Sequence, residues 1–312
     1  SLGLGDVYKR QIYGFVIFIT MYFAMFFLVI SIMHRKIFNK RIDYVNSGGL
    51  FSEVNQKSVF FDNSDKKNDS FFRFGIFFYP KSPKNINENN HLIILVCGYE
   101  ESYLDFKSEI FFWIENGYTV FCYDIKGTGK STGKLIGGFT QFLEDSLLAI
   151  EYIEKNEKFN KVSLIGHSMG GFAVATSLKF KKNFIDNSVV ISGFDYPSEF
   201  VRKSIASNFH IIFTWPIEIT IKIIEFLKFG KLSFNKSIKS INNFNKPVLI
   251  IQSIDDMVVK ISNSIYEKKE KITNKNVEYI LLKNSGHNPT KNITGGLNID
   301  LMNKINEFIS NN

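Results

Sequence analysis

The middle of the chain alternates short apolar runs with longer amphipathic segments. The apolar runs predict strands at Leu92–Cys97, Tyr118–Tyr123, Lys161–Ile165, Ser188–Ile191, Pro247–Gln252 and Val277–Leu282. The amphipathic segments predict helices at Tyr103–Glu115, Phe139–Asn156, Phe172–Phe180, Ser262–Lys271 and Ile299–Ile309. Two earlier aromatic runs, Ser58–Phe61 and Phe71–Tyr79, predict further strands. Buried strands that alternate with helices predict an α/β fold with a mostly parallel sheet covered by helices on both faces.

The alternation stops between residues 194 and 245. Within this stretch, Phe209–Leu232 is strongly apolar and predicts a helix interrupted at Pro216. An ordinary helix that covers the sheet is the alternative interpretation. The length of the stretch between two strands favours a helical cap inserted at about residues 194–245.

A long uncharged segment, Ile12–Met33, predicts a transmembrane anchor because it is long enough to cross a bilayer as a helix. An uncleaved signal peptide and a buried core helix are the alternatives. The run is longer than the apolar region of a signal peptide, and no small-residue cleavage site follows it. The basic flank His34–Arg41 predicts that the anchor is single-pass and that the main domain is cytoplasmic.

These boundaries divide the chain into four parts. Residues 1–11 are interpreted as a non-native leader, because "DVYKRQ" matches the translated end of a sequencing transposon. Residues 12–33 are the anchor, 34–57 a linker, and 58–312 the catalytic domain with its cap.

Composition excludes some functions. The 312 residues carry a formal net charge of +8, but the basic residues are spread along the chain rather than clustered, so nucleic acid is not the expected partner. Cys97 and Cys122 both lie in apolar runs and are expected to be buried thiols rather than a disulfide or metal site. We therefore expect no metal and no cofactor.

A nucleophile motif stands between a predicted strand and a predicted helix. Gly166-His167-Ser168-Met169-Gly170 fits the pattern G-x-S-x-G. A sharp turn here would lift the Ser168 hydroxyl above the sheet, and the two glycines would leave room for neighbouring backbone. The Met169 amide, at the helix N-terminus, could donate to an oxyanion. A glycine-rich turn without catalytic function is the alternative.

A serine nucleophile needs a base and an acid, which in this arrangement follow it in the order acid, then histidine. Of the five histidines, His287 alone fits, in a loop directly after the last predicted strand. His167 adjoins the serine and would point away. For the acid, Asp255 and Asp256 both follow the strand that begins at Pro247, and one of them could instead be structural. The sequence pattern alone barely separates the two.

From about Phe71 to its end, the chain resembles the α/β-hydrolase superfamily. It is most similar to the serine hydrolases that include monoacylglycerol lipases, lysophospholipases and S33-type serine aminopeptidases. The matching stretches are "VCGYEES", "YDIKGTGKSTGK", "GHSMGG", "VLIIQSIDDMVV" and "SGHN".

This resemblance implies roles for particular residues. The family's H-G-x-x-D-x-V loop aligns its acid with Asp256, although Gln252 and Ser253 replace the usual His-Gly and leave Asp255 as an alternative. The family's H-G-x loop aligns with "VCGYEES", which implies that the Tyr99 amide pairs with that of Met169 as the oxyanion hole.

The stretch "DIKGTGKSTG" looks like the end of a phosphate-binding loop, but it does not fit one. Such a loop needs glycine five positions before Gly129, and Asp124 stands there. Similar hydrolases carry a D-x-x-G-x-G-x-S turn at this point, which Asp124, Gly127, Gly129 and Ser131 match. We therefore expect a tight turn and no nucleotide partner.

Together these features predict a membrane-anchored serine hydrolase that cleaves carboxylic esters. The apolar cap and the anchor favour lipid esters of the monoacylglycerol or lysophospholipid type, bound as small-molecule acyl substrates. A peptidase or acyl-protein thioesterase of the same fold is the first alternative. A catalytically inactive, membrane-tethered binding protein is the second.

Overall fold

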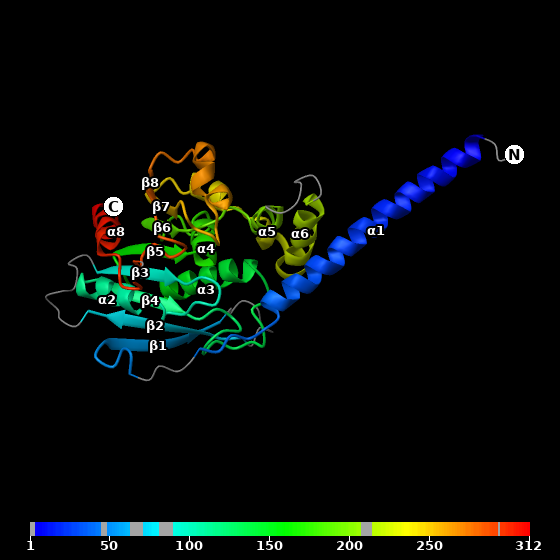
Figure 1. The fold of residues 1–312 in the computed structure, drawn as a ribbon. Helices are drawn as coiled ribbons and strands as arrows, with labels where there is room; N and C mark the ends of the chain where they lie inside the picture. Colours follow the sequence, from blue (N-terminus) through cyan, green and yellow to red (C-terminus); the bar gives the residue numbers. More distant parts are fainter. Residues whose placement is uncertain (1–3, 45–48, 63–70, 81–89, 207–213, 293) are drawn as a thin grey trace.

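The structure is a computed structural model that describes residues 4–44, 49–62, 71–80, 90–206, 214–292 and 294–312. A central sheet carries helices on both faces, and one long helix projects from the body (Figure 1). The predicted α/β fold is confirmed.

The sheet has eight strands in the order β1-β2-β4-β3-β5-β6-β7-β8. Their bounds are β1 Asn55–Phe61, β2 Arg73–Tyr79, β3 His91–Val96, β4 Thr119–Tyr123, β5 Lys161–His167, β6 Asn187–Ile191, β7 Val248–Ser253 and β8 Val277–Leu282. The first two strands pair antiparallel, β2 also lies antiparallel to β4, and every later pairing is parallel. β3 to β7 are almost wholly buried, which fits their continuous apolar sequences.

The helices form two layers. Their bounds are α1 Leu4–Phe38, α2 Lys107–Glu115, α3 Thr140–Asn156, α4 Met169–Ser177, α5 Pro197–Ala206, α6 Trp215–Phe229, η3 Gly230–Phe234, α7 Ser237–Asn242, η4 Ile261–Asn263, η5 Tyr266–Lys271 and α8 Ile299–Asn311. One buried cluster packs α3, α4 and α7 on one face of the sheet. A second cluster packs α2 and α8 on the other face.

The chain changes direction at β3. From β3 it passes through α2 to β4 on one side, and it later returns to β5 on the other side, followed by α4 on the opposite face. Open α/β sheets bind ligands at such a switch point, outside the carboxyl ends of the strands. The loops that follow β3 and β5 therefore meet at the place where a site is expected.

The stretch at about residues 194–245, predicted to be a cap, spans α5, α6, η3 and α7, and α7 packs on the sheet. The part of the predicted cap helix at 209–213 lies outside the described residues. Pro216 stands in the first turn of α6, where a missing amide hydrogen costs nothing.

One predicted helix is wrong. Ser262–Lys271 forms two short 3₁₀ helices, η4 and η5, rather than one α-helix. Ser264 breaks the run, because its backbone is extended and its hydroxyl donates to the Ile261 carbonyl and accepts from the Glu267 amide. A serine that bonds nearby backbone in this way competes with helical hydrogen bonding.

The long helix α1 lies against the cap along its second half (Figure 1). The Phe23 and Trp215 rings meet edge to face at 4.8 Å, and Ile30 is buried against Ile217. Further along, His34 Nε2 lies 2.8 Å from a carboxylate oxygen of the buried Glu225. Residues 5–38 form a helix long and apolar enough to cross a membrane by length and composition.

Candidate active site

Ser168 occupies a strained turn between β5 and α4. Its φ and ψ are 56° and −117°, which lie in a region that non-glycine residues rarely adopt. The Ser168 amide donates to the Ile191 carbonyl at 2.9 Å. A Cβ on Gly166 would overlap the Gly170 carbonyl, and one on Gly170 would overlap the Val96 carbonyl at the end of β3. Glycine at these two positions thus allows the elbow to pack against the neighbouring strand.

His287 and Asp256 are in contact. The Nδ1 atom of His287 lies 3.0 Å from Oδ1 and 2.9 Å from Oδ2 of Asp256. The carboxylate is almost fully buried, and Oδ1 also accepts from the Val258 and Val259 amides at 2.9 Å each. Its orientation is therefore fixed from two sides, and it holds one ring nitrogen of the imidazole.

Asp255 has a different set of partners. Its carboxylate accepts from the Ser253 hydroxyl at 2.5 Å and from the Ser285 and Gly286 amides at 3.1 and 3.3 Å. Asp255 is exposed and fixes the start of the loop that carries His287. Of the two aspartates that the sequence left open, the structure brings Asp256 to the imidazole and Asp255 to the backbone of the loop.

The backbone of His287 is tied to the elbow. Its carbonyl accepts from the Ser192 hydroxyl at 2.8 Å and from His167 Nε2 at 2.9 Å. The His167 and His287 rings are 4.7 Å apart between centroids. Since His167 directly precedes Ser168, these contacts bring the last loop of the sheet over the nucleophile turn.

His167 is buried and pairs with Glu101. Its Nδ1 atom lies 2.8 Å from Oε1 and 2.9 Å from Oε2 of that carboxylate. Burial lowers the pKa of His167, but the Glu101 carboxylate outweighs burial and the net shift is upward. Burial also raises the pKa of Glu101, yet the His167 imidazole and the Gly98 amide bring it below its ordinary value. Both shifts favour an ion pair beside the nucleophile between the buried His167 and the partly exposed Glu101.

The loop after β3 lies against the elbow. The Gly98 amide donates to Glu101 Oε2 at 2.5 Å, and a Cβ built on Gly98 would stand 3.1 Å from the Ser168 Cβ. Tyr99 follows at the rim of the loop. Met169 opens α4, so its amide belongs to the first turn, whose donors have no acceptor within the helix. The structure thus brings Gly98, the residue before Tyr99, against Ser168, and Met169 directly follows the serine.

The glycine-rich turn after β4 is closed by protein groups. The Lys130 amide donates to Asp124 Oδ2 at 2.8 Å, and the Ser131 hydroxyl donates to the Asp124 carbonyl at 2.6 Å. A Cβ on Gly129 would overlap the Asp124 carboxylate. Burial raises the pKa of Asp124 to about 6, although the Lys130 amide opposes that shift. The Lys130 amide, a donor that a phosphate-binding loop would offer to phosphate, is thus taken by a buried carboxylate.

Sequence reasoning missed Glu101, and it assigned no role to His167 or Ser192. Glu101 stands three positions after Gly98 in the "VCGYEES" stretch. At this spacing a carboxylate can fold back and accept from the glycine amide, which is the signal that could have identified it. Ser192 follows β6, the strand next to that of the elbow, and its φ of 50° marks a second tight turn there. Glu101 joins the loop after β3 to His167 at the end of β5, and Ser192 joins the turn after β6 to the His287 loop after β8.

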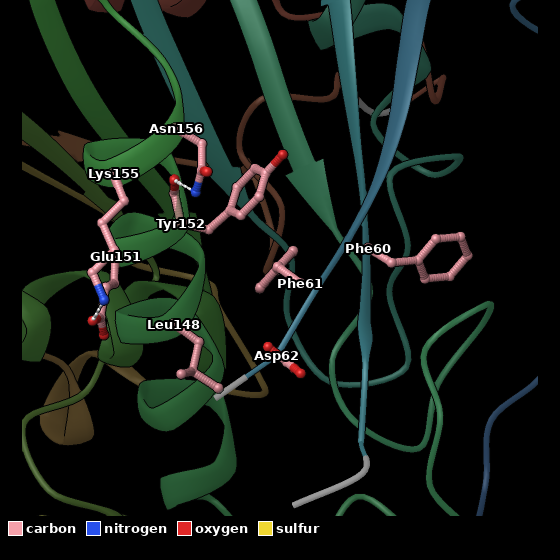
Figure 2. Close-up of a pocket in the computed structure, with 8 residues that line it drawn as sticks. All are labelled: Phe60, Phe61, Asp62, Leu148, Glu151, Tyr152, Lys155 and Asn156. Atoms are coloured by element: carbon pink, nitrogen blue, oxygen red, sulfur yellow. Dashed lines mark hydrogen bonds and ion pairs between the residues drawn. The ribbon is translucent and has the colours of Figure 1, made fainter. Parts of the chain in front are cut away.

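One surface groove lies away from these residues. Figure 2 shows a surface groove of about 320 Å³ between β1 and α3, lined by Phe60, Phe61, Asp62, Leu148, Glu151, Tyr152, Lys155 and Asn156. None of these eight is a predicted site residue. Within the described ranges, no group of three or more histidine, cysteine, aspartate or glutamate side chains is arranged to hold a metal ion.

Comparison with known proteins supports the same fold. Residues 87–213 match the family model described as serine aminopeptidase, S33. Among solved structures, the Pyrococcus furiosus esterase Pf2001 is 21% identical with a TM-score of 0.64, over 88% of this chain and 98% of that one.

Two further structures extend the comparison. Est1E from Butyrivibrio proteoclasticus, solved with ferulic acid bound, is 18% identical with a TM-score of 0.57, covering 81% of this chain and 98% of its own. The mouse α/β hydrolase domain-containing protein 10 is 16% identical with a TM-score of 0.55, covering 82% and 99%. No curated protein matches the sequence.

Proposed function

We propose that the chain is a serine hydrolase of the α/β-hydrolase superfamily, anchored in a membrane, and that it cleaves carboxylic esters; its fold and its partial match to the serine aminopeptidase model support this. One observation supports this most directly. The strained Ser168 elbow, the Asp256–His287 pair and the loop of Tyr99 all stand at the carboxyl ends of strands in one sheet. That set provides a nucleophile, a base with its orienting acid, and oxyanion donors.

The proposed reaction proceeds through an acyl-enzyme. Ser168 Oγ attacks the ester carbonyl while His287 Nε2 takes the hydroxyl proton, and Asp256 stabilises the imidazolium through Nδ1. The amides of Tyr99 and Met169 donate to the oxyanion as it develops. His287 then protonates the leaving alcohol, and a water activated by the same imidazole hydrolyses the acyl-enzyme.

A lipid ester is the proposed substrate class. Helix α6 presents Ile219, Ile223 and Leu227 to the outside at four-residue spacing, and Trp215, one turn earlier, is half-exposed where it packs on Phe23. The same helix packs on α1, whose uncharged part is the proposed membrane anchor. An acyl substrate drawn from the bilayer would meet an apolar surface next to the anchor.

We take the proposed domain boundaries and orientation from the sequence. We propose a leader at 1–11, an anchor at 12–33, a linker at 34–57 and a catalytic domain at 58–312, although the first strand of its sheet, β1, already begins at Asn55. The basic flank after the anchor supports a cytoplasmic catalytic domain, and Arg35 and Lys36 stand in the last turn of α1.

A peptidase is the second candidate, because the matching family model is described as a serine aminopeptidase. The same groups could attack an amide, provided that His287 protonates the poorer leaving amine. A pocket that recognises a free amino terminus would need a carboxylate near the nucleophile. Glu101 is such a carboxylate, but His167 and the Gly98 amide already occupy it.

The test is a substrate series on the full chain in detergent micelles. Activities toward p-nitrophenyl esters from acetyl to palmitoyl, monoacylglycerols and aminoacyl amides are compared, with Ser168→Ala as the background. We expect esters with longer acyl chains to give the highest kcat/KM, and His287→Ala to reduce turnover by at least about a thousandfold. Preference for aminoacyl amides would favour the peptidase, and a milder loss in His287→Ala would mean that the base is wrongly assigned.

A further inference from the structure

The segment that leaves the long helix, Ile37–Tyr44, is attached to the candidate site. We call it the juxtamembrane segment. The sequence indicated a basic flank and a linker here. In the structure the segment instead contacts the loop after β3 and the glycine-rich turn after β4, two loops whose strands are neighbours.

Three contacts join the segment to the loop after β3. The Tyr99 hydroxyl donates to the Ile37 carbonyl at 2.7 Å, at the end of α1, where backbone acceptors have no partner within the helix. Lys40 Nζ lies 2.5 Å from a Glu100 carboxylate oxygen, and the Tyr44 hydroxyl donates to the Glu101 carbonyl at 2.8 Å.

Ring packing strengthens this connection. Phe38 is fully buried, and its ring centroid stands 5.7 Å from that of Tyr99 and 4.7 Å from that of Phe139, both edge to face. Edge-to-face pairs of this kind are favourable beyond the area that they bury. Phe38 therefore anchors the end of α1 between the loop after β3 and the start of α3.

Backbone hydrogen bonds join the segment to the glycine-rich turn. The Ile42 amide donates to the Gly127 carbonyl at 3.0 Å, and the Gly129 amide donates to the Ile42 carbonyl at 2.8 Å. The Arg41 guanidinium donates to the carbonyls of Gly129, Ser131 and Gly133, the last two at 2.8 and 2.9 Å. A planar guanidinium with several donors suits this arrangement, whereas an ammonium group does not.

The loop after β3 needs such support. Glu100 has a φ of 62°, a conformation that is costly for a residue with a side chain and persists only when its surroundings hold it. On the inner side, the Glu101 carboxylate holds the Gly98 amide. On the outer side, the Tyr99 side chain is held by α1. The Tyr99 amide thus lies between the Gly98 amide, which Glu101 holds, and the Tyr99 side chain, which the end of α1 holds.

We propose that the juxtamembrane segment is a positioning element of the catalytic site, which fixes the Tyr99 amide as an oxyanion donor through the end of the membrane helix. This inference rests on the proposed function, in which that amide stabilises the transition state. Because α1 is one continuous helix, its seating in the bilayer and the geometry of the oxyanion loop are linked. The helix is then part of the machinery as well as an anchor.

The experiment uses Tyr99→Phe in the full chain in detergent micelles. Phenylalanine keeps the ring against Phe38 and the backbone amide, and removes the hydroxyl, which bonds the Ile37 carbonyl and also interacts with Lys40. We expect kcat to fall about tenfold with KM unchanged, since a misplaced oxyanion donor acts in the transition state. Affinity for an alkyl boronic acid, which forms a tetrahedral adduct on the serine, should fall by the same factor.

Arg41→Lys supplies an independent arm, and Tyr152→Phe is the matched control. Tyr152 lies on α3 in the groove of Figure 2, where its ring stacks on Phe61. We expect Arg41→Lys to lower kcat and boronate affinity together, and Tyr152→Phe to change neither.

Three outcomes would overturn the proposal. The first is wild-type kcat and boronate affinity in both Tyr99→Phe and Arg41→Lys. The second is a loss confined to the melting temperature or to the active fraction, with kcat per active site unchanged. The third is a wild-type chain that hydrolyses no ester, which removes the proposed function as well and is recognised by that absence of activity.

Discussion

Asp256→Asn tests the assignment of the acid at a single atom. In the wild type, Oδ1 accepts from the Val258 and Val259 amides, and Oδ2 faces His287 Nδ1 at 2.9 Å. Asparagine would keep its oxygen toward the two amides and turn its NH₂ group toward the imidazole. His287 must then accept at Nδ1 and carry its proton on Nε2, so it cannot take the proton of Ser168.

The expected loss follows from that tautomer. We predict that kcat toward the best ester falls about 10⁴-fold, which at about 1.36 kcal/mol per factor of ten is about 5 kcal/mol of transition-state stabilisation. The melting temperature should fall only slightly, because the shape and the two backbone hydrogen bonds are kept and the one bond lost is the long one of 3.3 Å from Gln252 Nε2 to Oδ2. Steady-state kinetics on the purified variant, corrected for traces of wild type, measures the effect.

Asp255→Asn is the matched control, since it makes the same chemical change one residue away. Its oxygen can still accept from Ser253 and the Ser285 amide, so we expect less than about a tenfold loss of kcat. A large loss in Asp255→Asn together with a small one in Asp256→Asn would refute the assignment and make Asp255 the acid.

Two further predictions concern buried charge. Because the pKa of His167 is raised, its pairing with the ionised Glu101 contributes in full at pH 6, below the ordinary 6.5 of a histidine, and this contribution is lost as the pH rises through the higher folded-state pKa. The loss of unfolding free energy in His167→Gln, from denaturant titrations, should therefore shrink from pH 6 to pH 9, and a constant or growing difference would contradict the ion pair. For Asp124, a pKa of about 6 against an ordinary 3.8 means that stability present below pH 3.8 is lost as the pH rises through about 6, by about 3 kcal/mol in total. Asp124→Asn should remove that slope, and an unchanged pH profile would show that the carboxyl titrates normally.

The sheet and the candidate site were largely predictable from local pattern. The apolar runs locate β3 to β8 within a residue or two, because strands buried on both faces have continuous apolar sequences. G-x-S-x-G predicts the elbow, because its glycines are required by close backbone approach around Ser168. The resemblance aligned the acid with Asp256, which is the aspartate that contacts His287.

Contacts between distant segments were not predictable in this way. Glu101 and His167 look like ordinary loop residues until the fold brings them together across 66 positions. The juxtamembrane segment reads as a basic linker, yet Arg41 reaches carbonyls about 90 positions away in the sequence. Neither contact leaves a periodic pattern or a fixed spacing that could be recognised in a single sequence. The failed helix at 262–271 had the opposite cause, a local hydrogen bond of Ser264 that overrides an amphipathic pattern.

The central claim is that Ser168 is a nucleophile activated by the fold. The most direct test treats the full chain in detergent with a fluorophosphonate probe and maps the modified residue by peptide mass spectrometry. The account predicts covalent labelling at Ser168 in the wild type and none in Ser168→Ala. A correctly folded wild type that is not labelled, or that is labelled at another residue while Ser168→Ala retains its esterase activity, would contradict it.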